Sequence, residues 1–146
     1  MKKIMIGCDP NAEDYKNKLI DFLKAKGNEV IDMGSDDPIY ANTAFRVAQA
    51  VASGEADRGV LICGTGLGVS ISANKVKGAY AALLNDVYSA ERAVKSNNSN
   101  IACIGAFTLG YRLAEKLVDV WLNTEYDEGT PSAEKIEAIK GYEQTC

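Results

Sequence analysis

The sequence predicts an α/β fold: a Rossmann-like, three-layer αβα sandwich around a five-stranded parallel sheet. Two observations lead to this prediction. Short apolar runs of strand length alternate with segments whose apolar residues recur at helical spacing. The runs are also apolar at successive positions, which is typical of parallel strands covered by helices on both faces. A chain of 146 residues, 47% hydrophobic and 25% charged, has the size of one compact domain, so we expect residues 1–146 to form a single domain.

The first half of the chain predicts three strands and three helices. Apolar runs of strand length occupy residues 3–7, 29–33 and 59–63. The helix after the first strand has its apolar residues at helical spacing and closes at Gly27, and the helix after the second stops near Gly54. A short helix over residues 67–74 follows the third strand.

The second half predicts two more strands, at residues 79–84 and 101–104, with a helix at 87–95 between them. The last long helix carries apolar residues at every fourth position: Leu109, Leu113, Leu117 and Trp121. From about residue 127 the chain becomes polar and ends in a helical stretch. Such a tail, residues 127–146, either folds back or packs on a neighbouring subunit, and we expect the second arrangement.

Charge and composition exclude several classes of partner. There are 16 basic and 20 acidic residues, with no block of like charges, so the sequence predicts no nucleic-acid or membrane surface. The apolar start is too short for a signal sequence and is broken by Asp9 and Pro10, which indicates a cytoplasmic protein. The four cysteines lack Cys-x-x-Cys spacing and the chain has no histidine, so no common metal pattern is present. We therefore expect reduced thiols and no metal.

The most informative segment is the run from Val60 to Ser70, which reads VLICGTGLGVS. A buried strand ends at Cys63, the chain turns on three alternating glycines, and a helix begins. The turn lacks the sixth-position glycine of the dinucleotide fingerprint and the lysine of a Walker loop, so we expect no cofactor. Because histidine is absent, proton chemistry near neutral pH must use Cys63, a carboxylate or bound water.

This turn suits proton abstraction next to a carbonyl group. Backbone N–H groups at a helix N-terminus stabilise an oxyanion, and the same field favours the thiolate form of Cys63. A thiolate base beside such donors fits an enediolate, which needs a base at carbon and donors at oxygen. We expect the thiol at the mouth of a hollow lined by these amides.

Simpler interpretations stand beside these. The glycine turn alone is compatible with a purely structural role, and Cys8 and Cys103 are expected to be small buried hydrophobic residues. Asp9 and Asp86 each fit a helix cap as well as a functional role.

The segment from residue 48 to 78 resembles the type B ribose-5-phosphate isomerases and the galactose-6-phosphate isomerase subunits. It reads AQAVASGEADRGVLICGTGLGVSISANKVKG, and weaker matches extend over nearly the whole chain. The resemblance implies a metal-free aldose–ketose isomerase of the enediol type without a cofactor. It also implies a homodimer or a dimer of dimers, with each site for a sugar or sugar phosphate lying between two subunits.

By matching position, the resemblance assigns Cys63 as the base that moves the proton between C1 and C2, and Thr65 as part of the enediolate cradle. It assigns substrate contacts to seven further residues: Asp9, Tyr40, Gly64, Gly66, Gly68, Ser70 and Asn97. Within this set Asp9 contacts sugar hydroxyls, and Asn97 lies near the reacting carbons.

Several positions depart from the family pattern. Pro10 and Ser96 stand where the family has histidines, the second of which opens the sugar ring, and Phe107 stands where it has an arginine. Residues 128–131 replace a further Gly-Gly-Arg-His motif. The cations left as candidates to bind a phosphate are Lys16, Arg112 and Lys135.

These departures leave three hypotheses open. The first is an active isomerase for a sugar that is already open-chain, such as a tetrose phosphate, or for one without a phosphate; pentose and hexose phosphates also belong to the range. The second is one subunit of a hetero-oligomeric isomerase of the galactose-6-phosphate type. The third is a non-catalytic sugar-binding protein, against which the intact Cys63 turn argues.

Overall fold

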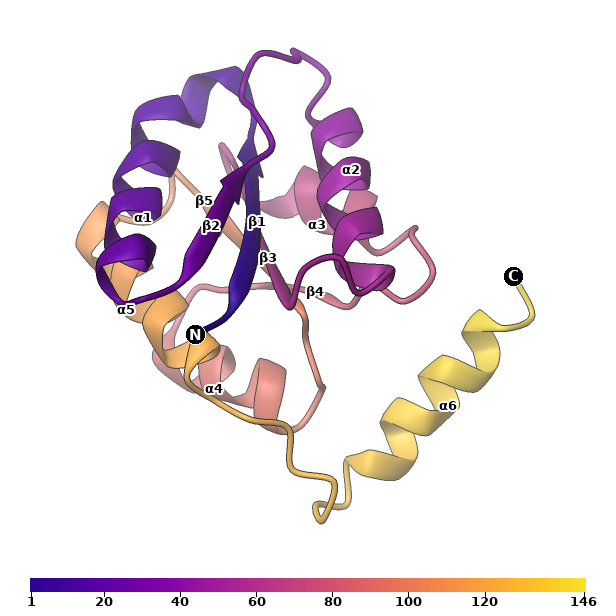
Figure 1. Cartoon of the computed structure of the whole chain (residues 1–146). Helices are drawn as coiled ribbons and strands as arrows, with labels where there is room; N and C mark the ends of the chain where they lie inside the picture. The colour runs from indigo at the N-terminus through magenta and orange to yellow at the C-terminus, as the bar shows by residue number, and fades with distance from the viewer.

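The computed structural model describes residues 1–146 and shows an α/β sandwich (Figure 1). The strands are β1 (Lys3–Cys8), β2 (Glu29–Asp32), β3 (Arg58–Cys63), β4 (Ala81–Leu83) and β5 (Ile101–Gly105). The helices are α1 (Glu13–Ala25), α2 (Tyr40–Ala52), α3 (Leu67–Ala73), α4 (Val87–Lys95), α5 (Tyr111–Leu122) and α6 (Ala133–Glu143), and the 3₁₀ turn η1 spans Pro10–Ala12.

All strand pairs are parallel, and the five strands lie in the order β2-β1-β3-β5-β4. This arrangement confirms the predicted five-stranded parallel sheet. The register places Cys8 beside Ile62 and Cys63 beside Gly105, so the carboxyl ends of the three central strands meet at one edge of the sheet.

Helices cover both faces of the sheet, as predicted, because strand side chains alternate between two cores. On β3, Val60 and Ile62 belong to the core formed with α1, α4 and α5. Leu61 and Cys63 belong to the core formed with α2 and α3. Figure 1 shows these two groups of helices on opposite sides of the strands. The thiol of Cys63 is therefore directed to the α2 and α3 side.

Two elements begin later in the structure than the sequence predicts, and one element was not predicted. β4 covers only residues 81–83 of the expected 79–84, and its first residue, Ala81, is bonded on its outer side by the Asn74 amide, which donates to Ala81 O at 3.0 Å and accepts from Ala81 N at 2.8 Å. The last long helix begins at Tyr111 rather than at Leu109, whose N–H donates instead to Gly105 O at 3.0 Å. The 3₁₀ turn η1 was not predicted.

The C-terminal helix α6 lies outside the three layers (Figure 1). It contacts its own chain: Ile136 is buried, and the Glu143 carboxylate accepts hydrogen bonds from Gly78 N and Tyr80 Oη, each at 2.7 Å. The tail thus folds back near β4, and its packing on a neighbouring subunit stays a prediction. None of the helices has the length and apolar character needed to cross a bilayer.

Candidate active site

The strand order places two predicted site residues at the same point of the sheet. From β1 the chain proceeds to β2 on one side and later to β3 on the other, so the order reverses between β1 and β3. In open parallel sheets, ligands bind beyond the carboxyl ends of the strands at such a reversal. Asp9 follows β1 and Cys63 ends β3, and the Asp9 N–H donates to Ile62 O at 3.0 Å.

Cys63 is held in one position by backbone contacts. Its Sγ accepts a hydrogen bond from Gly66 N at 3.1 Å, and its carbonyl oxygen accepts one from Ala106 N at 2.9 Å. The N–H···S contact fixes the direction of the sulfur relative to the turn. The thiol is 5% exposed.

The glycine turn after Cys63 leaves backbone donors unused. Gly66 has φ +79°, and a Cβ there would lie 2.6 Å from Leu83 Cδ1, so only glycine fits. The Thr65 Oγ1 accepts from Leu67 N at 3.2 Å. No acceptor in the chain receives the N–H groups of Gly68 and Val69, which open α3. These two N–H groups are the candidates for the oxyanion donors that the sequence predicts, although Val69 is buried in the single chain.

Tyr40 lies directly against the glycine turn. It is the first residue of α2, and its ring fills the space where a Cβ on Gly68 would lie. Gly68 is therefore needed for the close approach of this ring rather than for an unusual backbone angle. The structure brings Tyr40 and the turn together, as the site prediction requires.

Asp9 caps the turn that follows β1. Its Oδ1 accepts from Asn11 N at 2.6 Å, which is the capping role anticipated as the simpler interpretation. Oδ2 has no hydrogen-bond partner and stays free for a ligand. Asp86 also caps a helix, by accepting from Ser89 N at 2.7 Å, and this bond holds the pKa of its carboxyl below the ordinary value.

Ser70 is directed to a second thiol. Its hydroxyl lies beside Cys103, which is fully buried in the same core as Cys63. Burial raises the pKa of the Cys103 thiol, proximity to Cys63 raises it further, and the Ser70 hydroxyl lowers it in part. Cys103 is thus a protonated, buried group, as expected, but it is also a neighbour of Cys63. The strand register accounts for this proximity: Cys63 pairs with Gly105, and Cys103 lies two residues earlier on β5, on the same face of the sheet.

The cations proposed as phosphate ligands do not meet at this site. Lys16 is 2% exposed, and its Nζ lies 2.8 and 2.9 Å from the two carboxylate oxygens of Asp32. Arg112 is exposed and lies 3.4 Å from Glu115, and Lys135 is exposed on α6. Burial raises the pKa of the Cys8 thiol, next to Lys16, to about 12, which agrees with an inert core residue. Lys16 is therefore not the free cation that the sequence suggested.

Asn97 lies at the opposite edge of the sheet from Cys63. It precedes β5, whereas Cys63 lies beside Gly105 at the other end of that strand. The start of β5 at Ile101 and its end at Gly105 are four residue steps apart, which corresponds to roughly 13 Å. Within one chain the structure does not bring Asn97 to the other predicted site residues.

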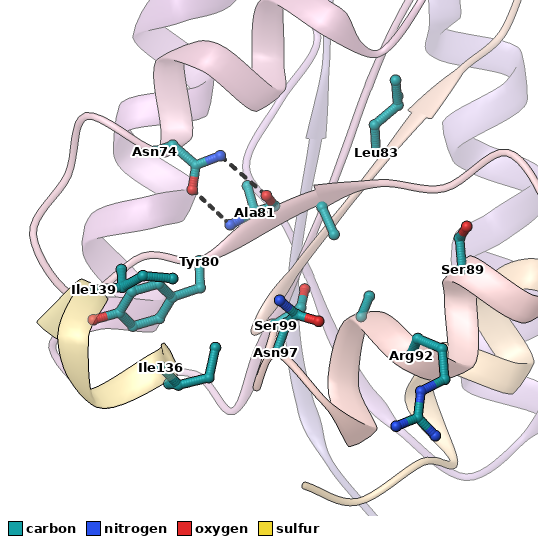
Figure 2. A pocket seen from close by; sticks show the side chains of 12 residues that line it. Asn74, Tyr80, Ala81, Leu83, Ser89, Arg92, Asn97, Ser99, Ile136 and Ile139 are labelled. Atoms are coloured by element: carbon teal, nitrogen blue, oxygen red, sulfur yellow. Dashed lines mark hydrogen bonds between the residues drawn. The ribbon is translucent and has the colours of Figure 1, made fainter. Parts of the chain in front are cut away.

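Asn97 instead lines a cavity of about 470 Å³ between β4, α4 and α6. Figure 2 shows Asn97 beside Ser99, with Ile136 and Ile139 of α6 near the Tyr80 ring. Four cavities are present, and none is lined by Cys63 or by the glycine turn. The expected amide-lined hollow is therefore absent from a single chain: Cys63 is buried in the core formed with α2 and α3, and no cavity adjoins it. No group of three or more Cys, Asp or Glu side chains is placed to hold a metal.

Phe107 lies against the turn in a way that the sequence did not indicate. Its N–H donates to Gly64 O at 2.9 Å, and a Cβ on Gly64 would lie 2.9 Å from its ring. The side chain is nevertheless 74% exposed. The sequence had marked this position only as one where a family arginine is missing.

Comparisons with known proteins agree with this geometry. The family model described as Ribose/Galactose Isomerase matches residues 4–139. A D-erythrulose-4-phosphate isomerase of Pectobacterium atrosepticum is 45% identical, with 98% of this chain and 96% of that protein covered. The galactose-6-phosphate isomerase subunit LacB of Clostridium acetobutylicum is also 45% identical, with 97% of this chain and 82% of that protein covered.

A solved structure shares the whole fold. Ribose-5-phosphate isomerase B of Clostridium thermocellum superposes with a TM-score of 0.92 at 42% identity, and 98% of each chain is covered. This similarity confirms the predicted fold class, and the family match confirms the resemblance noted in the sequence. The chain therefore belongs to the ribose/galactose isomerase family of sugar-phosphate isomerases.

Proposed function

We propose that this chain is a metal-independent aldose–ketose isomerase that acts on a four-carbon sugar phosphate through an enediolate, with Cys63 as the base. The observation that carries the proposal is the position of the Cys63 thiol. It ends β3 at the reversal of strand order, and its Sγ accepts the Gly66 N–H at 3.1 Å. A positioned base with a stabilised anion is what removal of a carbon-bound proton requires.

A single thiolate, that of Cys63, is enough to remove the proton from one carbon and return it to the other. The Cys63 thiolate takes the proton from C2 of the aldose, the C–H electron pair forms the C1=C2 double bond, and O1 takes the negative charge. The hydroxyl proton on O2 then passes to O1. As the C2=O2 bond forms, C1 takes the proton from the thiol, which gives the ketose and restores the thiolate.

The turn supplies the donors for the charge on oxygen. The free N–H groups of Gly68 and Val69 stabilise the enediolate because they are fixed before the reaction begins. The Thr65 Oγ1 already accepts the Leu67 N–H, so its own proton is available to the substrate. The free oxygen of Asp9 accepts a sugar hydroxyl, and Tyr40 covers the Gly68 side of the site.

Two observations favour a four-carbon substrate. The chain has no histidine and thus lacks the usual side chain for opening a sugar ring near neutral pH. A four-carbon sugar phosphorylated at O4 has no free hydroxyl that can close a five-membered ring, so it needs no ring opening. The relative from Pectobacterium atrosepticum carries the name of an isomerase for such a substrate.

We further propose that two copies of the chain complete each site. Asn97 lies at the far edge of its own sheet, and no cavity forms around Cys63 in a single chain. A second copy that presents its Asn97 edge to the Cys63 edge would cover the exposed residues of the turn, Thr65 and Leu67. The similarity to a LacB subunit supports the alternative that the second chain is a different homologue.

The test is conversion of D-erythrulose 4-phosphate in D₂O, followed by proton NMR. We expect the aldose to appear and deuterium to accumulate at its C2 over repeated turnovers. We expect no conversion by Cys63→Ala and full conversion by Cys146→Ala, which removes an exposed thiol. Activity of Cys63→Ala equal to that of the wild type would refute the proposed base. The wild-type chain could also be inactive on tetrose, pentose and hexose phosphates and on free sugars. If it then gains activity when a second homologous chain is added, the hetero-oligomer is established. Sugar binding without turnover under all conditions would establish the non-catalytic alternative.

A further inference from the structure

The aromatic ring of Phe107 occupies an unusual place beside the candidate site. It follows β5, and its backbone N–H donates to the carbonyl of Gly64, the residue directly after Cys63. A Cβ built on Gly64 would lie 2.9 Å from Cδ2 and 3.0 Å from Cε2 of the ring. The ring therefore rests on the backbone of the glycine turn.

This contact uses the missing side chain at residue 64. Gly66 has a positive φ that a side chain disfavours, but Gly64 does not. What excludes a side chain at Gly64 is the Phe107 ring alone, since its ring atoms are the only neighbours within 4 Å of a built Cβ. Residue 64 thus has no side chain at the point where the ring approaches the turn.

The ring is also exposed to an extent that packing does not explain. Three quarters of the Phe107 side chain, 74%, is accessible, although a phenyl ring gains free energy from burial. One part of the ring lies against Gly64, while the rest stays exposed in the single chain beside the glycine turn. An aromatic ring placed in this way is suited to contact the C–H groups of a ligand.

We propose that Phe107 is a specificity-determining residue that forms an apolar wall of the isomerase site, against which the carbon chain of the substrate packs. The inference rests on the proposed function and adds to it. The wall covers the reacting carbons rather than the phosphate, because it stands beside the turn that follows the base. It also keeps water from the Cys63 thiol while the thiol carries the substrate's proton.

If Phe107 keeps water from the thiol, the hydrogen that the thiol carries should return to the substrate more often than it exchanges with water, and this ratio can be measured. A thiol carries one proton, so a deuterium taken from C2 is either returned to C1 or lost to water by exchange. With an aldose deuterated at C2 in H₂O, the share of deuterium retained at C1 of the ketose reports how well the thiol is shielded. This share is a ratio per turnover, so it does not depend on the amount of folded enzyme.

The experiment compares Phe107→Ala and Phe107→Tyr with Tyr142→Ala, whose aromatic side chain on α6 is also 74% exposed. Phe107→Ala is expected to raise KM about tenfold and to lower the retained share of deuterium. Phe107→Tyr keeps the wall, and Tyr142→Ala leaves it untouched, so both should match the wild type in KM and in retention.

The outcomes separate this inference from the proposed function. An unchanged KM and unchanged retention in Phe107→Ala, together with an inactive Cys63→Ala, would overturn the wall and leave the isomerase standing. A wild type without isomerase activity would overturn the function itself. If Phe107→Ala does not fold, Gly64→Ala displaces the same ring and is expected to lower retention in the same way.

Discussion

The backbone N–H of Gly66 donates to the Sγ of Cys63, with 3.1 Å between N and Sγ, across a turn of four residues. The bond depends on the left-handed backbone of Gly66, at φ +79°. The backbone angle and the orientation of the thiol are therefore one structural feature, and a change in one alters the other.

Gly66→Ala tests this link. The substitution combines a disfavoured backbone angle with a Cβ that would lie 2.6 Å from Leu83 Cδ1 and 3.0 Å from the Ile104 carbonyl carbon. We expect a loss of roughly 2–5 kcal/mol in the free energy of unfolding, measured by urea denaturation, and a loss of isomerase activity. Gly110→Ala is the control, because nothing lies within 4 Å of its Cβ position. Equal stability of the two variants would contradict the strain argument.

The contact between Tyr40 and Gly68 predicts that the effect of Gly68→Ala on stability changes sign when the Tyr40 ring is removed. In the wild type, Gly68→Ala forces the Tyr40 ring aside and should destabilise the protein. In a Tyr40→Ala background the ring is absent, and the same change should stabilise α3 by up to about 1 kcal/mol, since alanine favours a helix over glycine. A double-mutant cycle by chemical denaturation measures the coupling. Additive effects would show that the ring does not occupy this space in solution.

The buried Lys16 depends on Asp32 for its charge balance. Asp32→Ala leaves an ammonium group that is 2% exposed without its carboxylate and should cost about 2–3 kcal/mol in the free energy of unfolding. Lys16→Met leaves only a carboxylate that is 43% exposed and solvated, so the loss should be smaller. Urea unfolding of both variants gives the order, and a larger loss for Lys16→Met would contradict it.

Alkaline pH should weaken the attachment of α6. Burial, and then the hydrogen bond to Glu143, raises the pKa of Tyr80 to about 12 from an ordinary value of 10.0. The folded state thus holds the phenol proton more tightly than the unfolded state, so the stabilisation is complete below pH 10 and is lost as the pH rises through 12. The difference in Tm between wild type and Tyr80→Phe should therefore shrink over this interval. A constant difference from pH 8 to 12 would contradict the prediction.

Mixing two inactive variants tests the shared site. Cys63→Ala and Asn97→Ala each disable both sites of a homodimer if Asn97 acts in the site of the second copy. Denatured together and refolded in equal amounts, they form hybrid dimers in which one of the two sites is intact. About a quarter of the wild-type activity should then return. No recovery, or full activity of Asn97→Ala alone, would count against a site completed by Asn97 of a second copy.

The extent to which the sequence predicted the site varies from residue to residue. Cys63, Thr65 and the three glycines could be named as candidates from the sequence because they are contiguous, and local chemistry shows where a strand ends and a helix begins. The bonds of the Asn74 side chain to Ala81, on the outer side of β4, were not predicted, because they join two different elements. The place of Phe107 was missed for the same reason: its contact with Gly64 joins residues that are 43 positions apart.

Hydrophobic periodicity and the glycine turn by themselves determined the parallel α/β architecture, the thiol at a strand end and the family resemblance. Periodicity and turn chemistry act over a few residues, so one chain without alignment or structure is enough to show them. Only the tertiary structure decided that Lys16 is paired with Asp32, that Tyr40 lies on Gly68, and that Asn97 stands at the far edge from Cys63. Those relationships depend on strand order and register, which bring distant segments together or hold them apart.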